Sequence, residues 1–514
     1  MILTTAEEAR TLDQIAMKDY GIPEMVLMEN AGSSVVHLME KYISWDSKDV
    51  VVVCGTGNNG GDGFVIARYA QEAGARVSIL LMGNESHMSE ASRCYRAVAE
   101  KMFMKAHVIT TAKEAAAEIR EADIIVDALI GTCLKRAVEG EKAWLIDEIN
   151  AADGLVISVD IPSGIDSDTG KALGMAVEAD FTVALGAVKR GHVLFPGSEY
   201  YTGRLLYSPI GIPNLARADH MKFPVQWEED WEIASLLPIR NQISHKGKNG
   251  FIGILAGSAG MEGAALLAGQ GALYSGGGKI AVVTVDQAAD RLAGKIPELM
   301  ISSLGNAPHF TENMIETAWE KAPAYDVLAI GPGLGRAKET GQFVKYFVTH
   351  WEKKLILDAD ALWAIAKEGI DLKSCPGQII LTPHVGEFAT LTGMSPKEIE
   401  ETRIDCAIDF AKKNQVTLVL KGAPTVVALP DGRAYVNSTG NPGMATGGMG
   451  DTLTGILAGL WGQGLETEAA AACGVYVHGK AGDLCAEKTP IGYTASDVAR
   501  MVPMALKTIK KELR

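Results

Sequence analysis

Two long series of short apolar runs, each separated by stretches with helical patterning, dominate the chain. The first series lies at 51–54, 77–82, 124–131, 155–160 and 181–186, and the second at 251–257, 279–285, 326–331, 354–360, 378–383 and 416–422. β-Branched runs of this kind, alternating with helices, are typical of parallel strands that are buried on both faces. The sequence therefore predicts an α/β protein with two parallel sheets, the second followed by a hairpin that turns on Pro430-Asp431-Gly432.

The two series belong to separate domains. A chain of 514 residues is too long for one typical core. Residues 211–235 lose the alternation and gather Pro, Trp and charged side chains. We predict a boundary near residue 225, with domains at 1–220 and 226–514.

Composition excludes several classes of protein. The formal net charge is -15, without the concentrated basic stripe that nucleic acids require. The seven cysteines are scattered without a C-x-x-C pair, which indicates reduced thiols and a cytoplasmic protein. No apolar run is long enough for a membrane helix, and the start of the chain carries a capping box, Thr5-x-x-Glu8, in place of a basic secretory signal.

The stretch GTGNNGGDGF at 55–64 follows the first predicted strand and precedes a predicted helix. It satisfies G-x-G-x-x-G, and Glu85 near the end of the next strand leaves the ordinary dinucleotide interpretation open. Asn58, Asn59 and Asp62 do not suit that interpretation, because a carboxylate repels a phosphate. Their oxygens suit a hard cation or a sugar hydroxyl.

Two further aspartates follow neighbouring predicted strands of the first series. Asp127 and Asp160 are expected at one sheet edge, with Ser163 in the loop after Asp160. Each aspartate alone is explained by capping the next turn. Three aspartates at adjacent strand ends, beside Asn and Ser, favour a site.

The motifs GTGNNGGDGF, VDALIGT at 126–132 and VDIPSGIDSDTG at 159–170 resemble the epimerase domain of bifunctional NAD(P)H-hydrate repair enzymes. The resemblance implies a Rossmann-like doubly wound fold and a substrate that is a hydrated reduced nicotinamide dinucleotide. It implies that Asn59, Asp127 and Ser163 hold K+ and that Asp160 is catalytic. The implied substrate-binding residues are Asn58, Asn59, Gly60, Gly61, Asp62, Gly131, Thr132, Cys133, Leu134, Lys135, Arg136, Ala137 and Asp160.

One position departs from that family, and one residue has two interpretations. The family usually reads G-T-G-L where this chain has Cys133 as the third residue, and we expect the thiol to crowd the phosphate-facing loop. Lys189 is either an acid–base partner or a solvated surface lysine.

The second series carries a different phosphate motif. GVYVHGKA at 474–481 resembles a P-loop, but it lies within a helical stretch and has Ala481 where a hydroxyl is needed, so we reject it. In GNPGMATGGMGD, residues 440–451, the glycines direct backbone N–H groups toward an anion at a helix expected to start near Thr452. Asp451 is then placed to take a proton from an attacking hydroxyl, or, alternatively, it only caps the helix.

This half resembles the ribokinase-like superfamily, and within it the nucleotide-dependent NAD(P)H-hydrate dehydratase. The supporting motifs are HKGKNG at 245–250, AGSAGMEGAALLA at 256–268, GPGLG at 331–335, LDADAL at 357–362, LTPHVGEF at 381–388 and KGAPTVV at 421–427. The resemblance implies a nucleotide site at Lys421, Gly422, Ala423, Pro424, Thr425 and Gly450. It implies a substrate site at Ala264, Gly333, His384 and Asp451, with Asp451 as the catalytic base. We expect Leu334 to pack inward, and His384 alone to be explained also as a structural histidine.

The two resemblances imply a division of labour. The first domain interconverts the R and S epimers of hydrated NADH and NADPH (NADHX and NADPHX). The second phosphorylates the S epimer with ADP and Mg2+ and eliminates phosphate, a better leaving group than hydroxide. We expect no nucleic-acid or membrane partner, and a homo-oligomer. The alternatives are a ribokinase-like small-molecule kinase with an accessory N-terminal domain, and an N-terminal half that only binds or senses a nucleotide.

Overall fold

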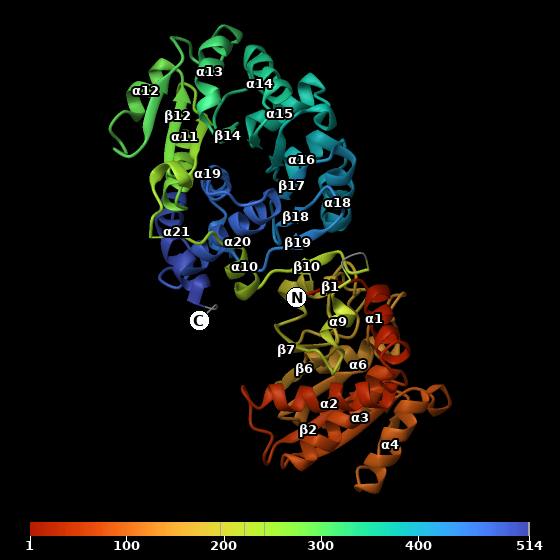
Figure 1. Ribbon diagram of the computed structural model, residues 1–514. Coiled ribbons are helices and arrows are strands. Elements are labelled where there is room, and N and C mark those ends of the chain that lie inside the picture. Colours follow the sequence, from red (N-terminus) through yellow and green to blue (C-terminus); the bar gives the residue numbers. More distant parts are fainter. Residues whose placement is uncertain (196, 220–221, 241, 512–514) are drawn as a thin grey trace. The chain divides into compact units, whose positions relative to one another are not determined.

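The computed structural model describes residues 1–195, 197–219, 222–240 and 242–511 (Figure 1). The chain divides into two compact units, unit 1 (Met1–Val225) and unit 2 (Gln226–Arg514). The domain ends predicted at residues 220 and 514 lie outside the described residues. No helix in the described part of the chain is long and apolar enough to cross a membrane.

Unit 1 contains a seven-stranded parallel sheet in the order β4-β3-β2-β5-β6-β7-β9. The chain builds one half of the sheet outward from β2 and the other half outward from β5, so the strand order reverses between these two strands. Ligands bind at such a reversal, beyond the carboxyl ends of the strands. The strands are β2 (Asp49–Cys54), β3 (Arg76–Met82), β4 (His107–Ile109), β5 (Ile124–Ala128), β6 (Leu155–Val159), β7 (Phe181–Leu185) and β9 (Arg204–Ser208).

Helices cover both faces of this sheet. Val50 and Val52 of β2 point into a core shared with the first four helices, whereas Val51 and Val53 point into a second core with α5 and α6. This alternation along one strand is why the run reads as continuously apolar. The helices are α1 (Ala6–Lys18), α2 (Glu24–Met39), α3 (Asn58–Glu72), α4 (Glu90–Lys101), α5 (Ala112–Glu121), α6 (Glu141–Asn150), α7 (Arg190–Val193), α8 (Gly197–Tyr200) and α9 (Asn214–Arg217), with a 3-10 turn at Glu85–His87.

A separate strand pair ties the start of the chain to the far end of the sheet. β1 (Leu3–Thr4) runs parallel to β8 (Val188–Lys189), with Thr4 opposite Lys189. Helix α1 then begins with the predicted capping box, in which the Thr5 hydroxyl accepts from Glu8 N and the Glu8 carboxylate accepts from Thr5 N. The pair fixes where α1 starts relative to β8.

Unit 2 contains a ten-stranded sheet in the order β10-β19-β18-β17-β16-β15-β14-β11-β12-β13. The strands from β13 through β17 pair in parallel, and the order reverses between β11 and β14. The predicted hairpin is confirmed, because β17, β18 and β19 pair antiparallel. The strands are β10 (Val225–Trp227), β11 (Phe251–Leu255), β12 (Lys279–Thr284), β13 (Met300–Ser303), β14 (Val327–Ile330), β15 (Lys354–Leu357), β16 (Gln378–Leu381), β17 (Thr417–Leu420), β18 (Val426–Ala428) and β19 (Ala434–Val436).

In Figure 1, α11, α19, α20 and α21 gather on one side of this sheet, and α14, α15, α16 and α18 on the other. The helices are α10 (Asp230–Leu236), α11 (Glu262–Tyr274), α12 (Asp286–Leu292), α13 (Ile315–Lys321), α14 (Lys338–His350), α15 (Asp360–Glu368), α16 (Val385–Thr392), α17 (Pro396–Glu401), α18 (Arg403–Asn414), α19 (Met449–Gly462), α20 (Thr467–Ala486) and α21 (Ala495–Lys510). Short 3-10 turns lie at Lys246–Asn249, Glu312–Met314, Ala322–Ala324, Leu372–Ser374 and Pro442–Met444. The rejected P-loop lies inside α20, as predicted.

Helices α11 and α19 pack backbone against backbone. A Cβ atom on Gly455 of α19 would lie 1.9 Å from the Ala268 carbonyl oxygen of α11. In the other direction, a Cβ on Gly271 would lie 2.3 Å from the Thr452 carbonyl oxygen. Both distances are far below van der Waals contact, so only glycine fits at these two positions.

The predicted apolar runs each contain a strand, but the structure adds elements that the sequence did not reveal. Strands β4, β9, β10 and β13 are short or half-buried and lack a long apolar run. Helix α19 begins at Met449 and not near Thr452. Helix α3 already begins at Asn58, so most of the quoted glycine motif is helical.

Candidate active sites

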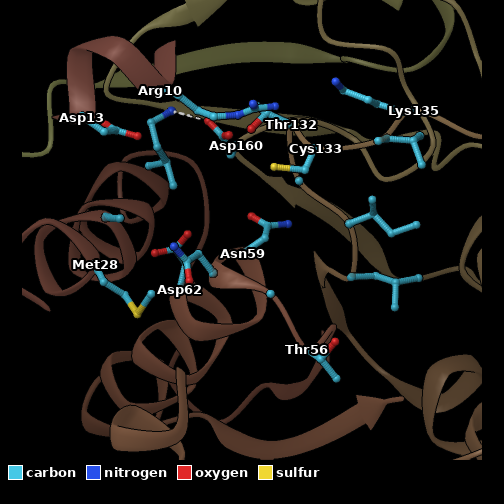
Figure 2. Close-up of a pocket in the computed structure, with 18 of the residues that line it drawn as sticks. Arg10, Asp13, Met28, Thr56, Asn59, Asp62, Thr132, Cys133, Lys135 and Asp160 are labelled. Atoms are coloured by element: carbon cyan, nitrogen blue, oxygen red, sulfur yellow. Dashed lines mark hydrogen bonds between the residues drawn. The ribbon is translucent and has the colours of Figure 1, made fainter. Parts of the chain in front are cut away.

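A cavity of about 850 Å³ lies in unit 1 beyond the carboxyl ends of β2 and β5, where the strand order reverses (Figure 2). Segments that follow β2, β5 and β6 line it, together with residues of α1, α2 and α3. Its volume is at the upper end of the range for small-molecule sites. Of the predicted site residues, those that line it are Asn58, Asn59, Asp62, Gly131, Thr132, Cys133, Leu134, Lys135, Arg136, Ala137 and Asp160.

Gly60 and Gly61 are buried in the first turns of α3 and do not line the cavity. A Cβ on Gly60 would lie 1.9 Å from the Gly55 carbonyl oxygen, and one on Gly61 would lie 2.6 Å from the Met28 sulfur. These glycines allow the helix start to sit directly against the loop after β2 and against α2. The result is that Asn58, Asn59 and Asp62 are carried to the cavity on a fixed helix end.

Asp160 directly follows β6 and is held in an unusual backbone conformation. Its φ is +68°, in the left-handed region that few non-glycine residues adopt. Its N–H donates to Val183 O at 2.9 Å, and its carbonyl accepts from His192 Nε2 at 2.7 Å. Because both backbone groups are bonded, the surroundings fix the direction of the carboxylate.

The Asp160 carboxylate is one half of a buried ion pair. Its Oδ1 accepts from Lys189 Nζ and from Leu185 N, the latter at 3.0 Å, and Lys189 also donates to Leu185 O at 2.8 Å. Lys189 is only 2% exposed, so the interpretation as a solvated surface lysine is wrong. His192 supports the pair: its Nδ1 accepts from Lys189 N at 3.0 Å, and burial lowers its pKa to about 4, so the ring is neutral.

Two other carboxyl groups face the same cavity as Asp160. Burial raises the pKa of Asp62 well above its usual range, and Asp160 and Asp13 raise it further. Burial also raises the pKa of Asp13 to about 6, with Lys189 opposing and Asp160 adding to the shift. Carboxyl groups with raised pKa values in one cavity are typical of proton-transfer sites.

Asp13 was not among the site residues predicted from the sequence. The residue lies on α1 with Arg10, Gln14 and Met17, which also line the cavity. Positions 10, 13, 14 and 17 are one helical stripe, adjacent to the buried stripe formed by Ala9, Leu12 and Ala16. A polar stripe beside an apolar one is what any surface helix shows, so the sequence held no signal that this stripe faces a cavity.

Asp127 and Ser163 lie buried beneath the cavity, outside its lining. Ser163 N and Ser158 Oγ both donate to the Asp127 carboxylate at 2.8 Å, and Ser163 Oγ donates at 2.5 Å. Asn59, at the cavity wall, has both polar side-chain atoms buried without a hydrogen-bond partner. Amide, carboxylate and hydroxyl oxygens together form a donor set that fits a hard cation.

The described residues contain no cluster of three or more His, Cys, Asp or Glu side chains that could hold a metal ion. This finding concerns only groups of three or more such side chains. It does not bear on the set formed by Asn59, Asp127 and Ser163, which includes a single carboxylate.

The cavity carries aspartates toward one end, with Arg10 beside them, and basic side chains toward the other. Figure 2 shows Asp13, Asp62 and Asp160 on one side of Asn59 and Lys135 on the other. The loop at 132–137 supplies Lys135 and Arg136, both of which are exposed. The Cys133 thiol lies exposed in the same loop, at the wall of the cavity.

Unit 2 gathers charged residues beyond the carboxyl ends of β15 and β17. Asp358, 1% exposed, accepts from Lys421 Nζ at 2.8 Å and from Thr454 Oγ1 of α19 at 2.8 Å. The carboxylate of Glu387 lies 3.8 Å from the same Lys421 nitrogen. The pKa of Lys421 is raised overall. Burial alone would lower it, but the attraction of Asp358, Glu387 and Asp451 outweighs the effect of burial.

Asp451 lies in the first turn of α19, next to this charged group. The N-cap is Gly448, with φ of +90°, so the interpretation of Asp451 as the cap is wrong. Burial raises the pKa of Asp451 to about 6, and repulsion from Asp358 adds to the shift while Lys421 opposes it. Gly450 leaves room for Lys421, because a Cβ there would lie 3.2 Å from its Nζ.

His384 is the N-cap of α16, and its side chain is largely exposed. Its Nδ1 accepts from Gly386 N at 3.0 Å and from Glu387 N at 3.3 Å, while Glu387 accepts from His384 N at 2.9 Å. The structural role considered for this histidine is therefore present. The same cap also orients Glu387 toward Lys421.

The remaining predicted residues of unit 2 lie in two places. Ala264 on α11 and Gly333 after β14 are neighbours, since a Cβ on Gly333 would lie 3.1 Å from the Ala264 methyl carbon. Leu334 is fully buried, which confirms that it packs inward. The segment Lys421–Thr425 joins β17 to β18 and is exposed or half-buried throughout.

Comparisons with known proteins agree for both halves of the chain. Residues 24–191 match the family model described as YjeF-related protein N-terminus, and residues 252–504 match that described as NAD(P)H-hydrate dehydratase. A ribokinase-like superfamily protein from Enterococcus faecalis has a TM-score of 0.51 at 26% identity, over 56% of this chain and 96% of its own.

Relatives that match nearly the whole chain are named as bifunctional enzymes. The bifunctional NAD(P)H-hydrate repair enzyme of Moorella thermoacetica is 38% identical, over 100% of this chain and 98% of its own. The enzyme of the same name from Escherichia coli is 34% identical, over 94% of this chain and 89% of its own. The chain therefore belongs to the family of bifunctional NAD(P)H-hydrate repair enzymes.

Proposed function

We propose that this chain repairs hydrated NADH and NADPH in two steps, epimerisation in unit 1 and ADP-dependent dehydration of the S epimer in unit 2. The observation that carries the proposal is the cavity of unit 1, which combines buried carboxyl groups at one end with a basic loop at the other. A dinucleotide matches this division, with its reactive ring among the carboxyl groups and its phosphates beside Lys135 and Arg136.

In unit 1 we assign catalysis to Asp160 and substrate binding to the first turns of α3 and the loop 131–137. The ion pair with Lys189 and the fixed backbone hold the Asp160 carboxylate toward the cavity. Asn58 and Asp62 supply hydrogen-bonding groups at the wall. Gly60 and Gly61 contribute through the position of the helix end, because their own lack of side chains allows that position.

We assign a potassium site to Asn59, Asp127 and Ser163. The unpartnered Asn59 amide and the charge of the buried Asp127 support this assignment. When bound, the ion supplies a fixed positive charge near the substrate and offsets the buried carboxylate. Asp127 itself positions the loop after β5 through its bonds to Leu129 N and Ser163.

In unit 2 we assign the nucleotide to Lys421, Gly422, Ala423, Pro424, Thr425 and Gly450. The substrate is assigned to Ala264, Gly333, His384 and Asp451. Asp451 as general base removes the proton of the ring hydroxyl as that oxygen attacks the β-phosphorus of ADP, and AMP leaves. The phosphate then leaves with the carbon–oxygen electron pair and a neighbouring carbon loses a proton, which restores the ring double bond.

The N-terminus of α19 suits the phosphoryl group. Gly447 and Gly448 expose backbone N–H groups at a helix start, where the dipole stabilises an anion. Mg2+ is expected with the nucleotide, since it neutralises the phosphate oxygens during transfer. We also propose a reducing, cytoplasmic setting, which the free thiols of all seven cysteines support.

The test uses purified full-length protein, a defined mixture of R and S hydrated NADH, and the absorbance of reduced nicotinamide. With ADP and Mg2+, we expect full recovery of both epimers. Asp160→Ala should recover only the S half at early times, and Asp451→Asn should recover neither, so each variant is the control for the other.

A small-molecule kinase would use the same helix start and the same aspartate, and differs in its product. If hydrated NADH is consumed into a stable phosphorylated compound, detected by mass spectrometry, unit 2 is a kinase. If neither ADP nor ATP restores absorbance, the dehydratase assignment fails. If the S half is recovered but the R half is not, unit 1 only binds the dinucleotide.

A further inference from the structure

We propose that Asp13 is a second catalytic acid–base residue of the epimerase site, acting on the face of the substrate ring opposite to Asp160. The inference rests on the proposed epimerase function and deepens it. Asp13 belongs to α1, at 6–18, whereas the matched family model covers residues 24–191.

The first support is position. Asp13 and Asp160 both line the cavity, one from α1 and the other from the end of β6, and Figure 2 shows both side chains directed into it. Two unconnected elements thus present carboxyl groups to one space. The β1–β8 pair explains why α1 is here, since it fixes the helix beside Lys189.

The second support is the difference between the two carboxyl groups. Asp160 accepts from Lys189 and from a backbone N–H, whereas no donor of this kind is bonded to Asp13 among the hydrogen bonds of the described residues. Burial raises the pKa of Asp13 to about 6, so it holds a proton far more readily than an ordinary aspartate. One acid and one base in the same cavity is the arrangement that proton transfer needs.

Charged groups from several elements act on Asp13. Lys189 and Arg217 lower its pKa, and Asp160 and Glu24 raise it. Asp62 is half-buried in the same cavity, and Asp13 contributes to raising the pKa of Asp62. Burial and the neighbouring carboxyl groups outweigh these cations, so the pKa of Asp13 is raised to about 6 and a fraction of the group still carries a proton near neutral pH.

The chemistry of the substrate requires such a pair. Water adds to an enamine with its oxygen on the carbon next to nitrogen, so the hydroxyl sits beside the ring nitrogen. Protonated Asp13 gives its proton to that oxygen, the carbon–oxygen bond breaks with its electrons going to oxygen, and water leaves. The nitrogen lone pair forms a carbon–nitrogen double bond, which makes the carbon planar.

The second half of the step reverses the first on the other face. A water molecule adds to the planar carbon from the side of Asp160, and its lone pair forms the new carbon–oxygen bond. Asp160 takes the released proton. Bulk water then returns a proton to Asp13 and removes one from Asp160, and the reverse reaction exchanges the two roles.

The test measures epimer exchange in the full-length chain without ADP, using separated R and S hydrated NADH. We expect Asp13→Asn to lower kcat by about 100-fold or more, with KM changed little, since general acid–base groups contribute factors of this size. Glu7→Gln makes the same chemical change on the exposed side of α1, and we expect wild-type exchange from it.

The pH profile separates a catalytic role from a structural one. Because Asp13 must carry a proton to act as the acid, wild-type exchange should fall as pH rises through about 6. This limb should be absent from the residual activity of Asp13→Asn. Asp13→Glu keeps a carboxyl group and should retain measurable exchange with a displaced limb.

The outcomes are distinguishable. Wild-type rate and pH profile in Asp13→Asn overturn the inference, and so does equal loss in Asp13→Asn and Asp13→Glu accompanied by loss of hydrogen-exchange protection in α1. Absence of exchange in the wild-type protein instead overturns the proposed epimerase function. Dehydration of the S epimer by unit 2 should be unchanged in all of these variants and reports that the chain is intact.

Discussion

Replacing Asp127 with Asn tests how the loop after β5 is held. Each carboxylate oxygen of Asp127 accepts one backbone N–H and one hydroxyl: Oδ1 accepts from Leu129 N at 3.3 Å and Ser163 Oγ, and Oδ2 accepts from Ser163 N at 2.8 Å and Ser158 Oγ. The hydroxyls can reverse, but the backbone donors cannot. Whichever way an amide is placed, its NH2 faces a buried N–H.

The magnitude follows from this conflict. Losing one hydrogen bond to a charged acceptor and leaving a buried N–H unpaired costs about 2–4 kcal/mol. Part of this is offset, because burial raises the pKa of Asp127 and the charged form therefore carries a cost that Asn does not. We expect a net loss of about 2 kcal/mol for unit 1, or about 30-fold in its opening constant.

Hydrogen–deuterium exchange is the suitable assay, because peptides from β2, β5 and β6 report on unit 1 alone in the full-length chain. Asp123→Asn is the matched control at the opposite end of β5: its Oδ2 accepts from Asp49 N at 2.9 Å, and its Oδ1 accepts from Lys48 Nζ at 3.2 Å. An Asn there can keep its oxygen toward the N–H and its NH2 outward, so we expect protection close to that of the wild-type protein. Equal protection in the two variants would refute the reasoning.

Three further outcomes are expected. Asp451→Asn should lower dehydration about 100-fold or more at unchanged ADP affinity, and wild-type dehydration should fall as pH drops through about 6, because the base must be ionised; a flat profile between pH 5 and 8 contradicts this. Lys421→Met should weaken ADP binding by calorimetry and destabilise unit 2 by about 3 kcal/mol, since Asp358 is left buried without its cation; unchanged protection of β15 peptides argues against it. Gly60→Ala should abolish binding of hydrated NADH in unit 1 while unit 2 keeps dehydrating the S epimer, because the added methyl group meets the Gly55 carbonyl at 1.9 Å.

The sheets could be predicted because their central strands are buried on both faces, which leaves long β-branched runs in the sequence. Edge strands need no such run, and β4 and β13 accordingly carried no signal. Asp160 and Asp127 could be predicted to lie at one edge of the sheet, because parallel strands bring their carboxyl ends together there. The starts of α3 and α19 were predicted several residues too far along the chain. Asn and Gly have low helix propensity, and Gly448 was not recognised as the N-cap of α19.

Other features depended on tertiary contacts that no local pattern records. Lys189 was left open between two interpretations because a lysine is usually exposed, and only the packing of β8 against β1 and the approach of Asp160 decide its burial. In the sequence, Asp13 looks like any polar residue on a surface helix, and only the position of α1 against the cavity distinguishes it. Both belong to the strand pair at the start of the chain, which joins residues far apart in sequence.

The contact between α11 and α19 has a mechanical consequence. Because Gly455 and Gly271 bring the two backbones together, neither helix can slide or rotate without a collision between main-chain atoms. Ala264 at the start of α11 and Asp451 at the start of α19 therefore move as parts of one rigid body. An adjustment of unit 2 that leaves this contact intact keeps the Asp451 carboxylate at a fixed position relative to Ala264.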